Sequence, residues 1–195
     1  MTIDPAKMEA LEARLRADHD VPGRFYHTFA HVEDCLARLE GIEGLSAGDR
    51  RLLRWALLWH DSVYDPERSD NEERSAERAV DELREAGADQ DEQQEVRRLI
   101  LLTKGHRVDA EDRLGAILVS VDLSILGAEP ARYRRYAADI RREYAHVPED
   151  AYRSGRMRVL HGLIEADPLY PDPALRERYE EQARINMAME MASLA

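Results

Sequence analysis

The chain has 195 residues, of which 44% are hydrophobic and 35% charged, and its formal net charge is −12. That length suits a single domain over residues 1–195, the apolar fraction excludes a disordered chain, and apolar runs such as 117–121 are too short to cross a bilayer. The acid excess argues against a broad nucleic-acid-binding face, and the single Cys35 excludes an internal disulfide. Because the first residues also lack a secretory pattern, we expect a cytoplasmic protein.

Helical periodicity is the main pattern along the chain. Apolar residues recur every three or four positions, and Gly or Pro interrupts the pattern between segments. The expected helices, in chain order, span about 8–20, 26–40, 47–60, 76–86, 93–106, 112–126, 132–146, 152–166 and 174–195. No run of four or more residues alternates convincingly between turn residues as a strand would. The sequence therefore predicts an all-α fold.

The expected helix 47–60 follows Ser46, a typical N-cap, and is apolar on most sides near its end. We expect it to be central in the fold, with His60 and Asp61 at its buried end. An ionised carboxylate that is buried without a partner costs several kcal/mol. Asp61 therefore needs a cation, a metal ion or strong donors, unless the helix end is simply capped by its own side chains.

Other histidines differ in their setting. His27 and His31 are four residues apart on an expected helix, so both would point to one face and could share a metal ion or a phosphate. His19 is also followed by Asp, but this pair precedes Val-Pro-Gly, which favours a solvated turn. His106 falls on an expected helical stripe with Leu99, and a hydrogen-bonded core histidine is an equally good interpretation.

Asp122 lies in segment 117–126, which is aliphatic apart from this residue and two serines. A carboxylate in such a setting must be protonated, paired with an arginine or bound to a metal ion. The arginine pair is a credible alternative in a chain so rich in arginine.

An early His followed by an aliphatic residue, an adjacent His-Asp and a later Asp resemble the signature of the HD-domain superfamily of metal-dependent phosphohydrolases. The longer similarity is to a bacterial subfamily usually labelled predicted metal-dependent HD phosphohydrolase. It covers nearly the whole chain in the strings RFYHTFAHV (24–32), ALLWHDSVYDP (56–66), DNEERSA (70–76), LILLTKGH (99–106), VDLSILG (121–127) and EQARINM (181–187). The resemblance implies an HD-domain helical bundle, with a metal-site core at about 24–127 and additional C-terminal helices at about 128–195.

The resemblance also implies that His31, His60, Asp61 and Asp122 are the four protein ligands of one divalent metal ion. Two imidazoles and two carboxylates suit Mn, Fe, Co, Ni or Zn, and Mg stays open as well. Such an ion acidifies a bound water and polarises a phosphoryl group.

Catalytic roles are expected next to the His-Asp pair. Alarmone hydrolases of the superfamily have two acidic residues three and four positions after the metal-binding Asp, and here these positions hold Tyr64 and Asp65. We therefore expect Asp65 to deprotonate the attacking water or to protonate the leaving oxygen, with Glu72 as the carboxylate that could replace the missing acid. Asp61 counts as catalytic through its expected role as a metal ligand. The alternative for Asp65 is a turn residue before Pro66.

Phosphate contacts are expected from His27, His106 and Arg156. The alternative for Arg156 is an ordinary pair with one of the many acids. Superfamily members with two metal ions have two extra histidines between the His-Asp pair and the last Asp, whereas only His106 lies there in this chain. The resemblance therefore favours a single ion.

Together these features predict a metal-dependent phosphohydrolase that cleaves an ester or anhydride of a small nucleotide or phosphorylated metabolite. The alternatives are a non-catalytic, nucleotide-sensing HD module and a di-iron HD oxygenase. No membrane or nucleic-acid partner is expected, and the oligomeric state stays open.

Overall fold

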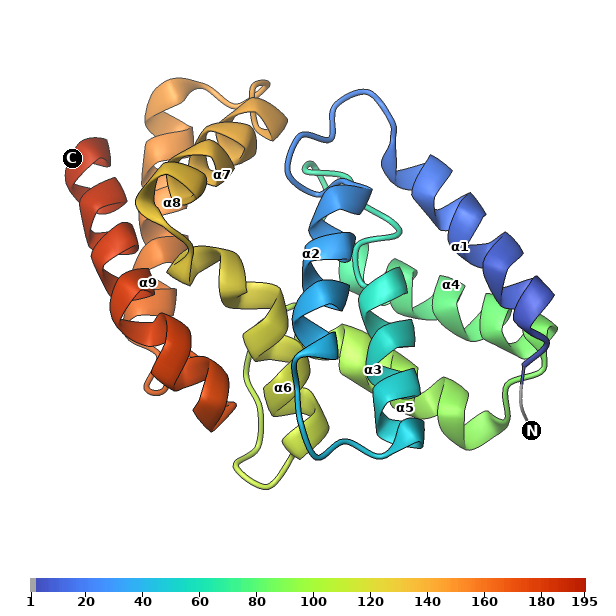
Figure 1. Cartoon of the computed structure of the whole chain (residues 1–195). Coiled ribbons are helices and arrows are strands. Elements are labelled where there is room, and N and C mark those ends of the chain that lie inside the picture. Colours follow the sequence, from blue (N-terminus) through green and yellow to red (C-terminus); the bar gives the residue numbers. More distant parts are fainter. Residues whose placement is uncertain (1–2) are drawn as a thin grey trace. The chain divides into compact units, whose positions relative to one another are not determined.

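The computed structural model describes residues 3–195, and these form nine α-helices and one short 3-10 helix with no strand (Figure 1). The all-α prediction is therefore confirmed. The chain divides into two compact units, the first ending at Asp109 and the second spanning Ala110–Ala195. The expectation of a single domain over 1–195, with a core at about 24–127, stays a prediction.

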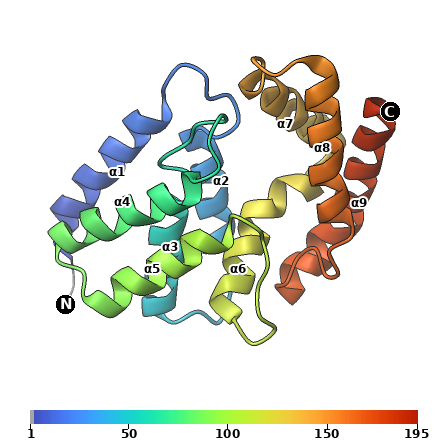
Figure 2. The ribbon, with the colours of Figure 1, turned by 180° about the vertical axis from the view of Figure 1, so that it is seen from behind.

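The first unit contains α1 (Pro5–His19), α2 (Phe29–Glu40), α3 (Ala47–Trp59), α4 (Asn71–Ala86) and α5 (Gln90–Leu102). Helix α4 packs along α5, and α3 contacts every other helix of the unit (Figures 1 and 2). Gly87 joins α4 to α5 in a left-handed conformation, with a φ of 100°, that glycine adopts without a steric cost.

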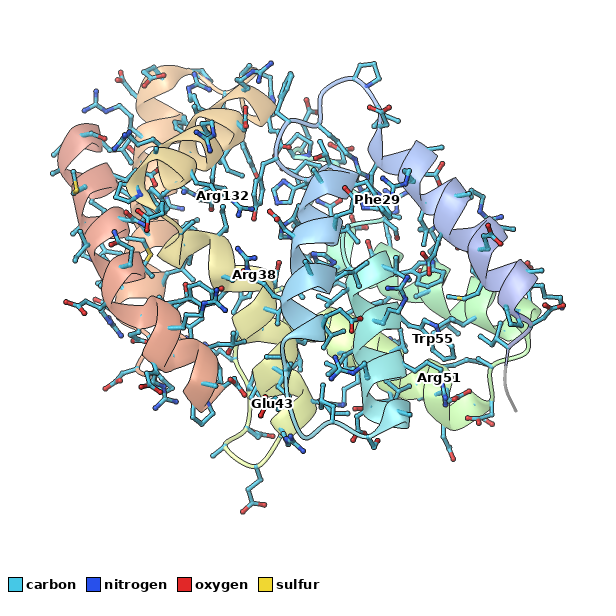
Figure 3. The ribbon with its side chains drawn as sticks, in the orientation of Figure 1. Phe29, Arg38, Glu43, Arg51, Trp55 and Arg132 are labelled. Carbon is cyan, nitrogen blue, oxygen red and sulfur yellow. The ribbon has the colours of Figure 1, made fainter. Side chains whose placement is uncertain are left out.

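Helix α3 is the centre of this unit, as its sequence predicts. Its buried residues are Leu53, Trp55, Ala56, Leu57, Leu58 and Trp59. Ser46 caps its first turn by accepting a hydrogen bond from the Asp49 N–H at 3.1 Å. On the outer side, the Arg51 guanidinium lies 5.4 Å from the centre of the Trp55 ring (Figure 3). Because the end of α3 is apolar and buried, it places the next two residues, His60 and Asp61, beside the core.

Several helix starts differ from the expected ones by two to five residues, and two of these starts lie next to the candidate site. Helix α2 begins at Phe29 rather than near residue 26, because residues 24–28 form a bent segment in which the Thr28 N–H donates to the Tyr26 carbonyl at 2.7 Å. Helix α4 begins at Asn71, five residues before the expected position. The Asn71 side chain bonds both the N–H and the carbonyl of Asp65, at 3.1 and 2.8 Å, and so fixes this start.

The end of α5 differs too. This helix ends at Leu102, and Thr103 caps it with a side-chain hydrogen bond to the Ile100 carbonyl at 2.8 Å. His106 follows outside the helix with a φ of 53°. The expectation that His106 continues the helical stripe of Leu99 is therefore wrong, because the chain leaves the helix before reaching it.

The second unit contains α6 (Arg113–Asp122), the 3-10 helix η1 (Leu123–Gly127), α7 (Pro130–Glu143), α8 (Glu149–Ile164) and α9 (Pro173–Leu194). Helix α9 packs closely on η1, and a Cβ atom at Gly127 would lie 2.6 Å from the Tyr179 carbonyl oxygen. Asn186 reinforces this contact by donating from Nδ2 to the carbonyls of Leu126 and Ala128, both at 2.8 Å.

No single helix in the described part of the chain is long and apolar enough to cross a membrane. One sharply bent pair, 113–127 with 130–143, meets the length and composition criteria when its two members are taken together.

Candidate metal site

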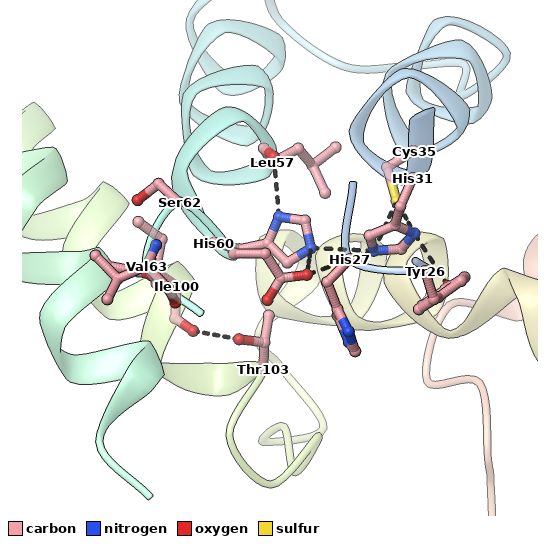
Figure 4. Close-up of polar contacts among 12 residues, drawn as sticks. Tyr26, His27, His31, Cys35, Leu57, His60, Ser62, Val63, Ile100 and Thr103 are labelled. Atoms are coloured by element: carbon pink, nitrogen blue, oxygen red, sulfur yellow. Dashed lines mark hydrogen bonds and ion pairs between the residues drawn. The ribbon is translucent and has the colours of Figure 1, made fainter. Parts of the chain in front are cut away.

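His60 directly follows the last residue of α3, and its side chain is almost wholly buried. Its Nδ1 atom lies 2.9 Å from the Leu57 carbonyl oxygen (Figure 4). Because a carbonyl only accepts hydrogen bonds, Nδ1 must carry a proton. In the neutral ring, Nε2 then holds a lone pair that is available to a metal ion.

His31 lies in the first turn of α2 and is also buried. Its Nε2 atom is 3.2 Å from Nε2 of His60, and its Nδ1 atom is 3.0 Å from the hydroxyl of Tyr26 (Figure 4). The sulfur of Cys35, one turn further along α2, lies 3.8 Å from both ring nitrogens. The His31 ring is therefore held on several sides with Nε2 directed at His60.

Asp61 completes the group. Its Oδ2 atom lies 3.1 Å from His60 Nε2 and 3.8 Å from His31 Nε2, and the side chain is 19% exposed. Three atoms from two separate segments, the start of α2 and the end of α3, therefore converge within one small volume. They form a group that could hold a metal ion.

The distances among these three atoms fit a metal ion. The circle through them has a radius of about 2.0 Å, so a point about 2.1 Å from each exists on either side of their plane, which matches usual metal–nitrogen and metal–oxygen distances. An ion there would have three protein ligands on one side. Positions would be left for a further ligand, water or substrate.

The electrostatics of Asp61 agree with this arrangement. Burial alone would raise the pKa of this carboxyl, but the positive charge and hydrogen bond that His60 supplies when its ring is protonated, together with the nearby His27 and His31, outweigh it. The pKa of Asp61 therefore lies well below its ordinary value. The side chain is a carboxylate at neutral pH, as a metal ligand must be.

Further side chains of the first unit lie around His31, His60 and Asp61. His27 precedes α2, so the expectation of two histidines on one helical face is wrong, although the His27 and His31 rings still lie 6.4 Å apart. Tyr64 stacks on His27 with ring centres 4.1 Å apart. Arg24 contacts the Tyr64 ring and bonds to the backbone carbonyl of Asp61. The sequence analysis missed this residue, although the string 24–32 contains it.

The expected proton-transfer residues lie after α3. Oδ1 of Asp65 accepts a hydrogen bond from the Glu67 N–H at 2.9 Å, which is the turn arrangement given as its alternative. Its Oδ2 atom makes no hydrogen bond with any residue that the structure describes. Glu72 is half-buried in the first turn of α4, where a negative charge also stabilises the helix.

Two predicted residues belong to the second unit. Asp122 ends α6 and is half-buried, and its role as a fourth ligand stays a prediction from the sequence. Arg156 is buried and donates from Nε and Nη2 to the carboxylate of Glu190 at 2.8 and 3.1 Å. This is the acid pairing given as its alternative, and it occupies the fork that a phosphate would need.

His19 was expected in a solvated turn, and this expectation is wrong. It ends α1 with no exposed surface, and its Nδ1 atom lies 2.8 Å from the Leu15 carbonyl oxygen. The ring packs edge-on against Phe29 with centres 5.6 Å apart. The local sequence does not indicate this burial, because the contact with Phe29 comes from another helix.

The chain was compared with protein-family models, curated proteins and solved structures, and no significant match was found.

Proposed function

We propose that this chain is a metal-dependent phosphohydrolase of the HD type, cleaving a phosphate ester or anhydride in a small nucleotide or phosphorylated metabolite. The observation that carries the proposal is the convergence of His31 Nε2, His60 Nε2 and Asp61 Oδ2 within 3.8 Å of one another. The sequence resemblance supplies the reaction class. The order of these three residues along the chain and their placement at two helix ends support that resemblance.

In the proposed site, His31, His60 and Asp61 hold one divalent ion, and Asp122 is the fourth ligand expected from the sequence. When bound, the ion supplies an acidified water and polarises the phosphoryl group. Mn, Fe, Co, Ni and Zn all suit the mixed imidazole and carboxylate donors, so the metal that gives activity in a test tube does not identify the natural one.

The remaining residues bind the substrate and move protons. Oδ2 of Asp65 can accept a proton while its Oδ1 stays bonded to the Glu67 N–H. The Tyr64 hydroxyl donates a hydrogen bond near neutral pH. His27, stacked on the Tyr64 ring, presents an imidazole that can contact a phosphate oxygen. Glu72 is the second candidate for the proton-transfer role.

A non-catalytic nucleotide-binding module is the second candidate function. One observation favours it: Tyr64 stands at the first of the two acidic positions, and Asp65, at the second, is engaged in a turn. Such a module would hold a metal ion and a nucleotide without cleaving it.

The direct test is a screen of nucleotides and phosphorylated metabolites with added Mn²⁺, Co²⁺ or Ni²⁺, with EDTA as the blank. We expect metal-dependent cleavage that is lost in His60→Ala and reduced about 10²- to 10⁴-fold in Asp65→Asn. Arg50→Gln is the control, because within residues 3–195 Arg50 bonds only to the carbonyls of Leu39 and Ile42, at and just after the end of α2, and to the Glu40 carboxylate. Equal cleavage by His60→Ala would contradict the proposal. Metal-loaded protein that binds nucleotides without turnover would favour the binding module.

A further inference from the structure

Arg24 bonds to two segments that meet at the candidate metal site. Its Nη1 atom donates to the Asp61 carbonyl at 2.7 Å and to the His27 carbonyl at 3.1 Å. Its Nη2 atom donates to the Ser62 carbonyl at 3.3 Å. One half-buried side chain thus ties the chain just after α3 to the chain just before α2.

The segment after α3 needs such a donor. The last carbonyl groups of a helix have no partner within the helix, and a positive charge there is favourable. The Ser62 N–H bonds back to the Trp59 carbonyl at 2.9 Å, whereas Asp61 and Ser62 lie beyond the end of α3 at Trp59. Arg24 bonds to both, and Arg78 adds one bond to Ser62 at 3.3 Å. Arg24 therefore fixes the backbone from which the Asp61 carboxylate projects.

The Arg24 guanidinium also contacts an aromatic side chain beside the site, that of Tyr64. It lies 5.6 Å from the centre of the Tyr64 ring, and Tyr64 in turn stacks on His27 at 4.1 Å. A cation over an aromatic ring is an attractive contact. Arg24, Tyr64 and His27 thus form one connected group of contacts next to the ligand residues.

We infer that Arg24 is a positioning residue of the proposed metal centre, holding Asp61 in the place where its Oδ2 atom faces His60 and His31. This inference rests on the proposed metal function. It goes beyond that function because Arg24 is not one of the expected ligands and acts through the backbone of Asp61. Side chains that orient ligands in this way typically change metal affinity about 10- to 100-fold when they are removed.

Arg50 provides a matched control. It also donates to two backbone carbonyls, those of Leu39 and Ile42, both at 2.6 Å. These acceptors lie at the C-terminal end of α2, about 12 Å along the helix from His31. Loss of Arg50 therefore removes the same kind of bond from the same unit without touching the segment that carries Asp61.

The test is a Co²⁺ titration followed by visible absorption, with the melting temperature of each metal-free protein measured in parallel. We expect Arg24→Gln to weaken Co²⁺ binding about 10- to 100-fold, and Arg24→Lys, which keeps the charge, to recover part of the loss. Arg50→Gln should lower the melting temperature by a similar amount but keep the wild-type affinity. If Arg24→Gln does not fold, Arg24→Lys is compared with Arg50→Gln on the same two measurements.

Wild-type Co²⁺ affinity in a folded Arg24 variant would overturn the positioning role, whatever happens to its melting temperature. A failure of the proposed metal function gives a different result in the same titration. In that case the wild-type protein takes up no Co²⁺, or His60→Ala binds it equally well, and the inference about Arg24 falls with it.

Discussion

The Nδ1 atom of His60 lies 2.9 Å from the carbonyl oxygen of Leu57, one turn earlier in the chain. This bond fixes the proton on Nδ1 and leaves the Nε2 lone pair facing Oδ2 of Asp61 at 3.1 Å. Two electron-rich atoms at that distance repel each other unless a proton or a metal ion lies between them. Because of this one backbone hydrogen bond, a proton or a metal ion is needed between Nε2 of His60 and Oδ2 of Asp61.

Metal affinity should depend on pH. Metal ligands bind in their deprotonated forms, so metal binding releases protons and weakens as the pH falls. Asp61 does not add to this effect near neutral pH, because the pKa of its carboxyl lies below the ordinary value. We expect affinity to fall steadily from pH 8 to pH 5. Calorimetric titration in buffers of different ionisation enthalpy measures the protons released, and an affinity that is constant over this range would contradict the imidazole ligands.

His19 should make the metal-free protein less stable in acid. Burial lowers the pKa of His19 to about 4, and this effect outweighs the opposing hydrogen bond to Leu15. The unfolded chain, with a pKa near 6.5, therefore binds the proton first, and stability is lost as the pH falls from about 6.5 to about 4. The full difference is ~3 kcal/mol.

Urea unfolding at pH 7.5 and pH 4.5, in the presence of EDTA, measures this loss. His19→Gln lacks the titrating group and should show a smaller pH dependence than the wild-type protein. If both proteins lose the same stability between the two pH values, the loss does not come from His19.

Gly127 should not tolerate a side chain. A Cβ atom there would lie 2.6 Å from the carbonyl oxygen and 2.9 Å from the Cα atom of Tyr179, which are both backbone atoms. Because backbone cannot rotate away, we expect Gly127→Ala to lower the free energy of unfolding by about 1–3 kcal/mol.

Gly155→Ala is the matched control in the same unit. Gly155 lies within α8, and a Cβ atom there meets nothing within 4 Å. We expect it to stabilise the protein by about 0.5–1 kcal/mol, as alanine usually does inside a helix. Urea unfolding compares the two variants, and an equal effect of both would show that the contact between η1 and α9 is not tight.

The sequence predicted the parts of the fold that local pattern determines. Helix α3 could be predicted because Ser46 caps it and its apolar run ends at His60. The start of α4 could not, because residues 70–75 are polar, and a side-chain contact with Asp65 fixes the first turn there.

Burial of the two His-Asp pairs shows the same limit. His60 follows an apolar run on its own helix, so its burial can be seen in the local sequence. His19 lies in a polar stretch, and its buried ring contacts Phe29, which belongs to another helix. Pattern alone also gave no role to Arg24, because its acceptors are backbone carbonyls that carry no sequence signal.

The metal content of Asp61→Asn, compared with wild-type protein and with Asp20→Asn, tests the central claim most directly. Asp20 belongs to the other His-Asp pair and is exposed, so it is a control of matched chemistry. Equilibrium dialysis against Mn²⁺ or Co²⁺, followed by metal analysis, should give about one ion per chain for the wild-type protein and Asp20→Asn, and a much lower occupancy for Asp61→Asn. A folded Asp61→Asn protein that carries as much metal as the wild type would contradict the proposed metal centre.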